Sequence, residues 1–282
     1  MNKLQIGVVV DMPKEHFPFW NDGLREALNV LSYDIGWDIF VYNVQVNSMI
    51  PTNHDFYLFW SSLLSPQVQV RRFPKQGLLF GGGPTYAKSL FNFDIIFAES
   101  KVDMLDFKRF GIPTVQAFGT NTKLFKPMNL TKYFDYFYPA AFAKWKHHEK
   151  FVEYIKDKSE KDNQLYTALA VGYMQPNDVE KECYEMCEQH DVLVLPWVSP
   201  DVIARFYNHS NNVLITADAS GGCQRTVLEA KACNTNVIIE SDSPKLKELA
   251  MLTYEDVVNN WNQYSYAKKL QDGIMKIMVE AK

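Results

Sequence analysis

Long hydrophobic runs are missing from this sequence. A helix that crosses a membrane needs about 20 consecutive apolar residues, and every apolar run here is much shorter. The chain begins with the strand-like residues LQIGVVV rather than with the basic and then apolar segments of a signal peptide. We therefore expect a cytoplasmic protein without a transmembrane segment.

Cysteine is also scarce, with four in 282 residues. The four are not spaced like the disulfide framework of a small secreted domain, which agrees with a cytoplasmic location. Cys183 and Cys187 lie four residues apart on an expected helix, and His190 follows one turn later. Three such side chains on one face suit a metal ion, but small apolar side chains packed against a sheet explain the pattern more simply. We expect no metal site and no cofactor.

A strong charge of either sign is absent as well. The net charge is −4, so the protein has no general attraction for nucleic acids. The most basic run, KWKHHEK at residues 144–150, follows the aromatic run YFDYFYPAAF. This combination can bind single strands, but it is more typical of a solvated helix face after a buried strand. A nucleic-acid partner is therefore disfavoured, although it stays open.

Short apolar segments alternate with segments of helical periodicity along the whole chain. This alternation is typical of β-α units around a parallel sheet, and the length suits two domains. The first expected strands cover residues 4–10, 37–44, 55–60, 77–80, 94–98 and 113–117. The second set covers residues 134–138, 165–171, 191–195, 212–216 and 236–240. The sequence thus predicts an α/β fold with two Rossmann-like domains that face each other across a cleft.

Helices are expected between these strands. They cover residues 20–32, 101–110, 146–158, 178–189, 200–209, 224–233 and 244–250, and a last one covers about 255–280. We expect an N-terminal domain at 1–128, a C-terminal domain at 129–255, and a final helix within 256–282 that packs back across the domains. Open parallel sheets bind ligands at the carboxyl ends of their strands, so the cleft is the expected site.

Residues 216–249 carry the most informative motif, TADASGGCQRTVLEAKACNTNVIIESDSPKLKEL. The glycines after the expected strand permit close approach of the backbone. The helix that begins near Gln224, just after Gly222–Cys223, points its unpaired N–H groups into the cleft. With Arg225 and Thr226 beside it, this helix start can hold a diphosphate.

Glu229 lies one turn further along the same helix. Its carboxylate can accept two ribose hydroxyl groups at once, so the motif as a whole can hold a nucleoside diphosphate. A simpler interpretation stands beside this one, because Gly-Gly before a helix is common and a glutamate in mid-helix is usually only solvated.

Residues 199–249, SPDVIARFYNHSNNVLITADASGGCQRTVLEAKACNTNVIIESDSPKLKEL, resemble the carboxyl-terminal signature of the family 4 glycosyltransferases. Upstream, ESKVDMLDFKRFGIPTVQAFGTNTKLFKP is similar to that family's domain junction, with Gly119, Asn121, Phe125 and Pro127 in the junction positions. KHHEKFVEYI resembles the element KG.e.li.A that opens the first helix of the family's second domain. The resemblance covers roughly residues 95–250.

The resemblance implies the GT-B architecture and transfer of a hexosyl or pentosyl group from a nucleotide sugar, with retention of configuration and without a metal. Matched residue by residue, Lys146 would pair with the donor diphosphate, and Glu229 would hold the ribose. The loop that contains Trp197 and Val198 would border the base. Since departure of the diphosphate builds negative charge, cations and helix N–H groups must stabilise it; Lys146 and Arg225 are the candidates for this catalytic role.

Three departures from the family pattern stand out. Gly221 replaces a glutamate that touches the donor sugar, Ala140–Ala141 replace a Gly-Arg pair, and Asn121 replaces an aspartate. We expect Arg225 to supply the missing charge from the other side of the phosphates. The glycine at 221 leaves open which sugar is transferred, and whether activity is altered or lost.

Candidate acceptor contacts lie in the first domain. Asp11 and His16 follow the first expected strand, and Gly82 and Gly83 belong to the run GGG after a later strand. A tight turn alone explains that run about as well as ligand binding does. The acceptor is open between a glycan, a lipid, a protein and a modified nucleobase.

The sequence as a whole favours a metal-independent retaining glycosyltransferase that uses a UDP- or GDP-sugar. Two alternatives remain. One is a catalytically inactive GT-B module that binds a nucleotide sugar, which Gly221 and Ala141 favour. The other is a nucleotide-sugar epimerase, which needs paired carboxylates for acid and base work, and no such pair stands out in the sequence.

Overall fold

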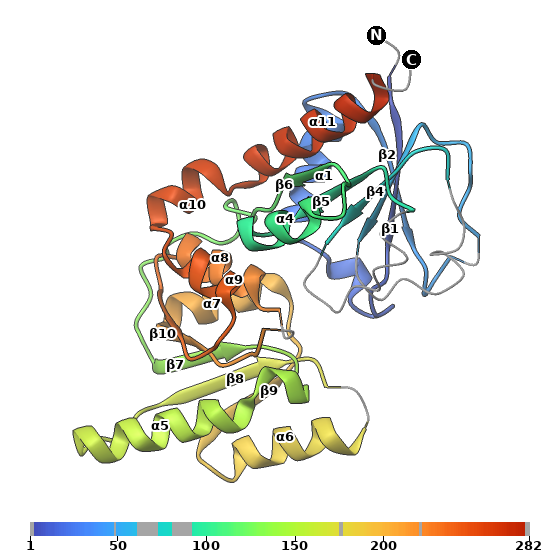
Figure 1. The fold of residues 1–282 in the computed structure, drawn as a ribbon. Helices are drawn as coiled ribbons and strands as arrows, with labels where there is room; N and C mark the ends of the chain where they lie inside the picture. Colours follow the sequence, from blue (N-terminus) through green and yellow to red (C-terminus); the bar gives the residue numbers. More distant parts are fainter. Residues whose placement is uncertain are drawn as a thin grey trace. The chain divides into compact units, whose positions relative to one another are not determined.

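The computed structural model describes residues 3–47, 49–60, 73–80, 92–174, 177–219 and 222–279 (Figure 1). The chain divides into two compact units. Unit 1 comprises Met1–Asn121 and Asn260–Lys282, and unit 2 comprises Thr122–Asn259.

Unit 1 is built on a six-stranded sheet with the order β2-β1-β3-β4-β5-β6. All neighbouring strands are parallel. The strands are β1 (Gln5–Val10), β2 (Asp38–Asn43), β3 (Phe56–Trp60), β4 (Gln76–Leu79), β5 (Ile95–Ala98) and β6 (Thr114–Gln116). The six strands expected from the sequence are therefore confirmed, and their near-continuous apolar character follows from burial on both faces.

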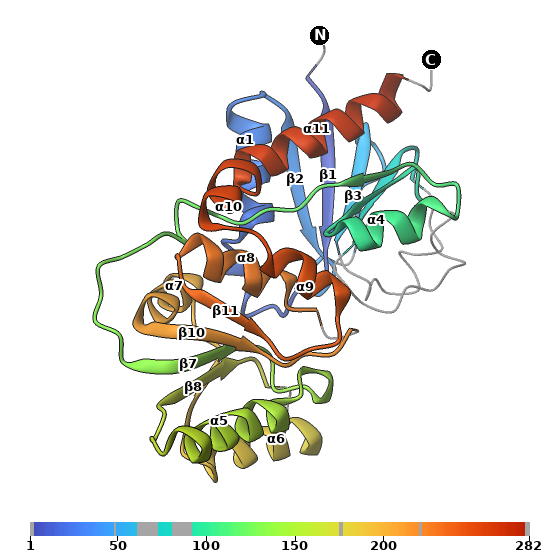
Figure 2. The same ribbon diagram turned by 60° about the vertical axis from the view of Figure 1, so that its left-hand side comes forward.

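Two hydrophobic cores cover the two faces of this sheet. Along β1, Val8 and Val10 point into one core and Val9 into the other, as the alternation of side chains along a strand requires. The first core contains α1 (Gly23–Tyr33) and α11 (Gln263–Val279), and the second contains Phe107 of α4 (Lys101–Lys108). Figure 2 shows α1 and α11 beside each other along the sheet.

The C-terminal segment is not the single helix that the sequence predicted. α10 (Tyr254–Asn260) ends before Trp261, and α11 begins at Gln263. The break has a local cause, because the Asn262 side chain accepts hydrogen bonds from the backbone N–H groups of Tyr264 and Ser265, both at 2.9 Å. The freed Trp261 carbonyl instead accepts the Thr120 N–H at 2.8 Å. α11 then packs into unit 1, where Gly273 lets it approach Phe97 of β5.

Unit 2 is built on a five-stranded parallel sheet with the order β11-β10-β7-β8-β9. Its strands are β7 (Phe134–Pro139), β8 (Ala168–Gly172), β9 (Val192–Pro196), β10 (Ser210–Ile215) and β11 (Asn236–Ile239). All five expected strands are present. The chain runs β7, β8 and β9 in one direction across the sheet and then returns to the other side of β7 for β10 and β11. The carboxyl ends of β7 and β10, which are neighbours, therefore lie where the strand order reverses.

The helices of unit 2 cover both faces of the sheet. α5 (His148–Asp162) and α6 (Asp178–Glu188) lie on one face, and α7 (Pro200–His209), α8 (Gln224–Ala232) and α9 (Pro244–Ala250) lie on the other (Figures 1 and 2). α5 starts two residues later than the sequence predicted, because a 3-10 turn at Lys144–Lys146 precedes it. The predicted start of α7 is confirmed with Ser199 as the N-cap position, although its side chain makes no capping hydrogen bond with a described residue.

Within the described ranges no helix combines the length and the apolar character that a membrane crossing needs.

Candidate functional site

The loop between β10 and α8 brings the backbone to the carboxyl edge of the sheet in unit 2. Gly222 and Cys223 both adopt positive φ angles, 75° and 77°, directly before α8 starts at Gln224. Glycine takes this conformation freely, but the Cβ of a cysteine is strained there. Strained residues of this kind gather at functional sites, so the entry to α8 is the first candidate. Gly221 lies outside the described residues.

The first turn of α8 contains no acidic side chain. Cys223 is the N-cap residue, and its side chain makes no capping hydrogen bond with a described residue. The N-terminus of a helix carries a partial positive charge on its unpaired N–H groups. Among the described residues, no capping side chain offsets the partial positive charge at this helix start.

Lys146 brings a full positive charge to the same place. Its Nζ lies 3.3 Å from Sγ of Cys223, and a Cβ built on Gly222 would lie 3.6 Å from it. A cation beside a helix N-terminus is unfavourable without an anion. The ammonium group, the strained backbone and the α8 N-terminus therefore form a site with the charge and the donors that a phosphate group needs.

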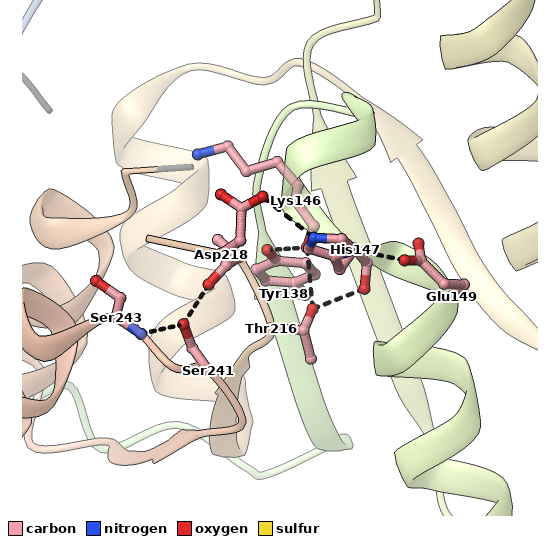
Figure 3. A network of polar contacts seen from close by, with 9 residues as sticks. Tyr138, Lys146, His147, Glu149, Thr216, Asp218, Ser241 and Ser243 are labelled. Atoms are coloured by element: carbon pink, nitrogen blue, oxygen red, sulfur yellow. Dashed lines mark hydrogen bonds and ion pairs between the residues drawn. The ribbon is translucent and has the colours of Figure 1, made fainter. Parts of the chain in front are cut away.

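Polar contacts fix the turn that carries Lys146 (Figure 3). The Tyr138 hydroxyl donates to the Lys146 carbonyl at 2.7 Å. Thr216 Oγ1 lies 3.0 Å from the same carbonyl and 2.9 Å from the His147 carbonyl, and donates to one of them. Burial raises the pKa of Tyr138 well above its usual value, so this hydroxyl keeps its proton. The backbone of Lys146 is thereby attached to β7 and to the end of β10, while its side chain points away from the network.

Glu229 is buried rather than solvated, which rules out the simpler interpretation of this residue. The residue is 7% exposed, and its carboxylate accepts a hydrogen bond at 3.0 Å from the hydroxyl of Tyr207, on α7. Burial and the nearby Glu229 raise the pKa of Tyr207 well above its usual value, so the hydroxyl stays a donor. Buried carboxylates are kept when they are paired or functional. The sequence could not show this pairing, because Tyr207 lies on a different helix.

Arg225 faces the same carboxylate from the first turn of α8. Its Nε lies 3.6 Å from Glu229 Oε1, and its side chain is 50% exposed. A half-exposed pair at i, i+4 is weak, and the place of Arg225 in the first turn keeps its guanidinium near the helix start. The structure therefore places Lys146 and Arg225 at the start of α8 and Glu229 one turn beyond.

The other predicted donor contacts lie in two places. Gln224 and Thr226 are buried in the first turn of α8, and the Thr226 hydroxyl donates to the carbonyl of Pro139 at 3.3 Å. Thr226 thus joins α8 to the end of β7, and its side chain is already engaged. Trp197 and Val198 are half-buried in the loop after β9, at the same carboxyl edge of the parallel sheet.

Two of the predicted acceptor contacts are described, and both belong to unit 1. Asp11 follows β1 and accepts a hydrogen bond from Gln45 Nε2 at 2.9 Å. His16 precedes the 3-10 turn Phe17–Phe19, and burial lowers its pKa. Gly82 and Gly83 lie outside the described residues.

Ala140 and Ala141 follow directly after β7. A Cβ on Gly172 of β8 would lie 1.8 Å from the Ala140 carbonyl oxygen, so the two strand ends are in backbone contact. Ala140 is buried and Ala141 is half-buried. Neither side chain can supply charge, which leaves the cations at this edge to Lys146 and Arg225 among the residues we predicted.

A separate cavity of 590 Å³ opens beside α5. Its lining is mostly acidic and consists of Lys150, Glu153, Tyr154, Asp157, Thr216, Asp218, Glu240, Ser241 and Asp242. Carboxylates repel a diphosphate, so this cavity has the wrong charge for the phosphates of a nucleotide. The candidate site is the start of α8.

Comparisons with known proteins add a fold-level result. No family model and no curated protein matches the sequence. A glycosyltransferase from Rickettsia africae ESF-5 is structurally similar, with a TM-score of 0.66, 16% identity and 100% of both chains covered. The sucrose-phosphate synthase of Thermosynechococcus elongatus is also similar, with a TM-score of 0.61, 13% identity, and 99% of this chain and 97% of that chain covered. Anabaena HepE in complex with UDP and glucose is similar as well, with a TM-score of 0.58, 13% identity, and 99% of this chain and 98% of that chain covered.

These similarities confirm the predicted fold class. The chain has an α/β structure with two parallel sheets, and it matches the GT-B fold of glycosyltransferases along its whole length. At 11–16% identity the comparison describes the backbone and leaves the chemistry to be argued from the site.

Proposed function

We propose that this protein is a retaining glycosyltransferase that transfers a hexosyl or pentosyl group from a UDP- or GDP-sugar to an acceptor. One observation carries the proposal: the Lys146 ammonium group lies at the N-terminus of α8, with Arg225 in the first turn and Glu229 one turn beyond. Two cations and a helix start suit a diphosphate, and a held carboxylate suits a ribose. The GT-B fold, which HepE shares with bound UDP and glucose, supports the same ligand.

The chemistry asked of these residues is leaving-group stabilisation. When the bond between the sugar and the diphosphate breaks, negative charge grows on the distal phosphate. Lys146 and Arg225 offset that charge, and the α8 N–H groups donate to the phosphate oxygens. With these groups at the phosphates, the reaction is proposed to need no metal ion.

Glu229 has a different task in this proposal. Tyr207 occupies one of its oxygens with a hydrogen bond of 3.0 Å, which fixes the rotamer of the buried carboxylate. In the complex the carboxylate accepts hydrogen bonds from the ribose hydroxyls. Trp197 and Val198, in the loop after β9, border the base, and Asp11 and His16 contact the acceptor, which is a glycan, a lipid, a protein or a modified nucleobase.

The proposed compartment is the cytoplasm. All four cysteines are free thiols, and Cys187 and Cys233 are buried. Burial raises the pKa of Cys187 to about 12, so it behaves as a small packed side chain rather than as a metal ligand.

Calorimetric titration with UDP, GDP and ADP tests the proposal, followed by an assay of sugar release from the matching nucleotide sugar in the presence of EDTA. We expect one of UDP and GDP to bind with micromolar affinity and its sugar to be released slowly by water without an acceptor. Failure of all three nucleotides to bind would refute the proposal. Tight binding without any turnover would instead establish the inactive binding module, which the uncharged Ala141 favours.

A further inference from the structure

His147 has a backbone conformation that its residue type does not favour. It connects the 3-10 turn at Lys144–Lys146 to α5, and its φ and ψ angles are 53° and 54°. This is the left-handed region, which glycine enters without strain and a residue with a Cβ does not. Something in the surroundings must hold His147 there.

Two polar contacts of the imidazole ring hold His147 in this conformation. Nδ1 lies 2.5 Å from Glu149 Oε1, in the first turn of α5, and Nε2 lies 3.3 Å from Asp218 Oδ2 (Figure 3). Asp218 belongs to the loop that leads from β10 to α8. The ring is only 23% exposed, and the Asp218 side chain is 34% exposed. The ring therefore joins the Lys146 turn to the segment that leads to the phosphate site.

A backbone hydrogen bond joins the same two segments. The Asp218 N–H donates to the Trp145 carbonyl at 3.2 Å, in the turn that ends at Lys146. Asp218 thus makes two contacts with that turn. Its backbone N–H contacts Trp145 and its carboxylate contacts His147, the residues directly before and after Lys146. The position of the Lys146 Cα relative to α8 is set by these contacts together with those of Tyr138 and Thr216.

We propose that His147 is a positioning residue for diphosphate binding. Its ring holds the left-handed backbone against Asp218. This backbone then places the Lys146 ammonium group 3.3 Å from Sγ of Cys223, at the start of α8. The inference rests on the proposed function, because it assigns His147 a task only if Lys146 binds the donor phosphates. It adds a residue that does not itself touch the nucleotide.

Two substitutions distinguish the effect of the imidazole ring from the effect of the strained backbone conformation. His147→Ala removes the ring and keeps the unfavourable conformation, whereas His147→Gly removes the ring and relieves the strain. Asn163, at the other end of α5, has a φ angle of 49°. Asn163→Ala and Asn163→Gly are therefore matched controls that change the same kind of backbone position on the same helix.

The experiment measures the affinity of each variant for whichever of UDP and GDP binds the wild type more tightly, and for the corresponding nucleoside. We expect both His147 variants to bind the diphosphate about tenfold more weakly and the nucleoside as the wild type does. The Asn163 pair leaves both affinities unchanged. Thermal melting of His147→Gly at or near the wild-type temperature shows that its lost affinity is not lost folding.

The double variant Lys146→Ala with His147→Gly tests whether His147 acts through Lys146. If it does, the double variant binds the diphosphate no more weakly than Lys146→Ala alone. An additive loss, or an unchanged affinity of His147→Gly where Lys146→Ala is impaired, would overturn the role of His147 and leave the proposed function standing. A wild type that binds no nucleoside diphosphate would end both.

Discussion

The ammonium group of Lys146 lies 3.3 Å from Sγ of Cys223, the strained residue that precedes α8. Two positive features, a lysine side chain and a helix N-terminus, thus meet without an acidic residue in the first helical turn. This arrangement is unfavourable on its own and favourable around an anion.

Lys146→Ala is expected to weaken the binding of UDP or GDP by about 10- to 100-fold, because a charge-assisted contact to phosphate contributes about 1.5–3 kcal/mol. The affinity for the nucleoside alone stays unchanged. Lys144→Ala is the matched control, since Lys144 is an exposed lysine in the same turn. Calorimetric titration of both variants measures the difference, and equal losses in the two would point to a general effect of net charge.

Arg225→Ala is expected to raise the donor KM or to lower kcat at least tenfold. The arginine is half-exposed and only weakly paired with Glu229, so its removal costs little stability, about 0.5 kcal/mol or less. Arg205, which is exposed on α7, provides the control substitution. Steady-state kinetics and a thermal melt of both variants test the prediction, and an Arg225→Ala enzyme with wild-type kinetics would refute it.

Glu229 is expected to make the protein distinguish ribonucleotides from their deoxy forms. Wild type should prefer UDP or GDP to the 2′,3′-dideoxy nucleotide by about tenfold or more. The dideoxy nucleotide lacks the two ribose hydroxyls that donate hydrogen bonds to the Glu229 carboxylate. Glu229→Gln should reduce that preference to a few-fold, and Glu229→Ala should remove it. Competition titrations with the two nucleotides provide the measurement, and a preference that survives in Glu229→Ala would place the ribose elsewhere.

Tyr207→Phe gives a companion to this experiment. It leaves the buried Glu229 carboxylate without the hydrogen bond of 3.0 Å, which should lower the free energy of unfolding by about 1–3 kcal/mol. Urea denaturation measures that loss. An unchanged stability would show that the Tyr207 hydroxyl contributes nothing to holding the carboxylate.

His148 is expected to make the protein sensitive to mild acid. The ring is fully buried, stacks against Phe142, and finds no hydrogen-bond partner among the described residues. Burial, with Lys146 and His147 nearby, lowers its pKa from 6.5 to about 3. Because the folded-state value is the lower one, the unfolded chain takes up a proton that the native state refuses, and stability falls as the pH drops below 6.5.

The variant His148→Phe removes this titration and keeps an aromatic ring. Between pH 7 and pH 5 the wild type should lose about 2 kcal/mol more than the variant, as the linkage relation gives for one such proton. Urea denaturation of both proteins at the two pH values provides the comparison. Parallel losses would mean that His148 is protonated in the folded protein.

Much of the fold was predictable from the sequence, because strands buried on both faces are short continuous apolar runs. The runs around Val8 and Val213 mark central strands for this reason. The breaks that the sequence did not reveal depend on single side chains. Asn262 ends α10 by bonding to the next backbone N–H groups, and nothing in the local apolar pattern signals it.

The site was predictable to a smaller extent. Lys146 and Glu229 were predicted because their residue types and order match a known pattern, and Arg225 was predicted because it lies at the start of the same helix. The structure places Lys146 and Arg225 at the start of α8, with Glu229 one turn beyond. Thr216 and His147 were missed, since their contacts join segments about 70 residues apart. Tyr138 was missed because nothing in an apolar strand shows that its hydroxyl contacts the Lys146 carbonyl. The sequence signal for a left-handed backbone at His147 lies in the resemblance alone, because the element KG.e.li.A has a glycine at this position.

A crystal structure with the bound nucleoside diphosphate, UDP or GDP, tests the central claim most directly. We predict that the distal phosphate lies within 3.2 Å, an ordinary hydrogen-bond distance, of Lys146 Nζ and of at least one backbone nitrogen in the first turn of α8. The ribose hydroxyls should lie within hydrogen-bond distance of the Glu229 carboxylate. Phosphates bound at any other place, with the start of α8 occupied by solvent alone, would contradict the account.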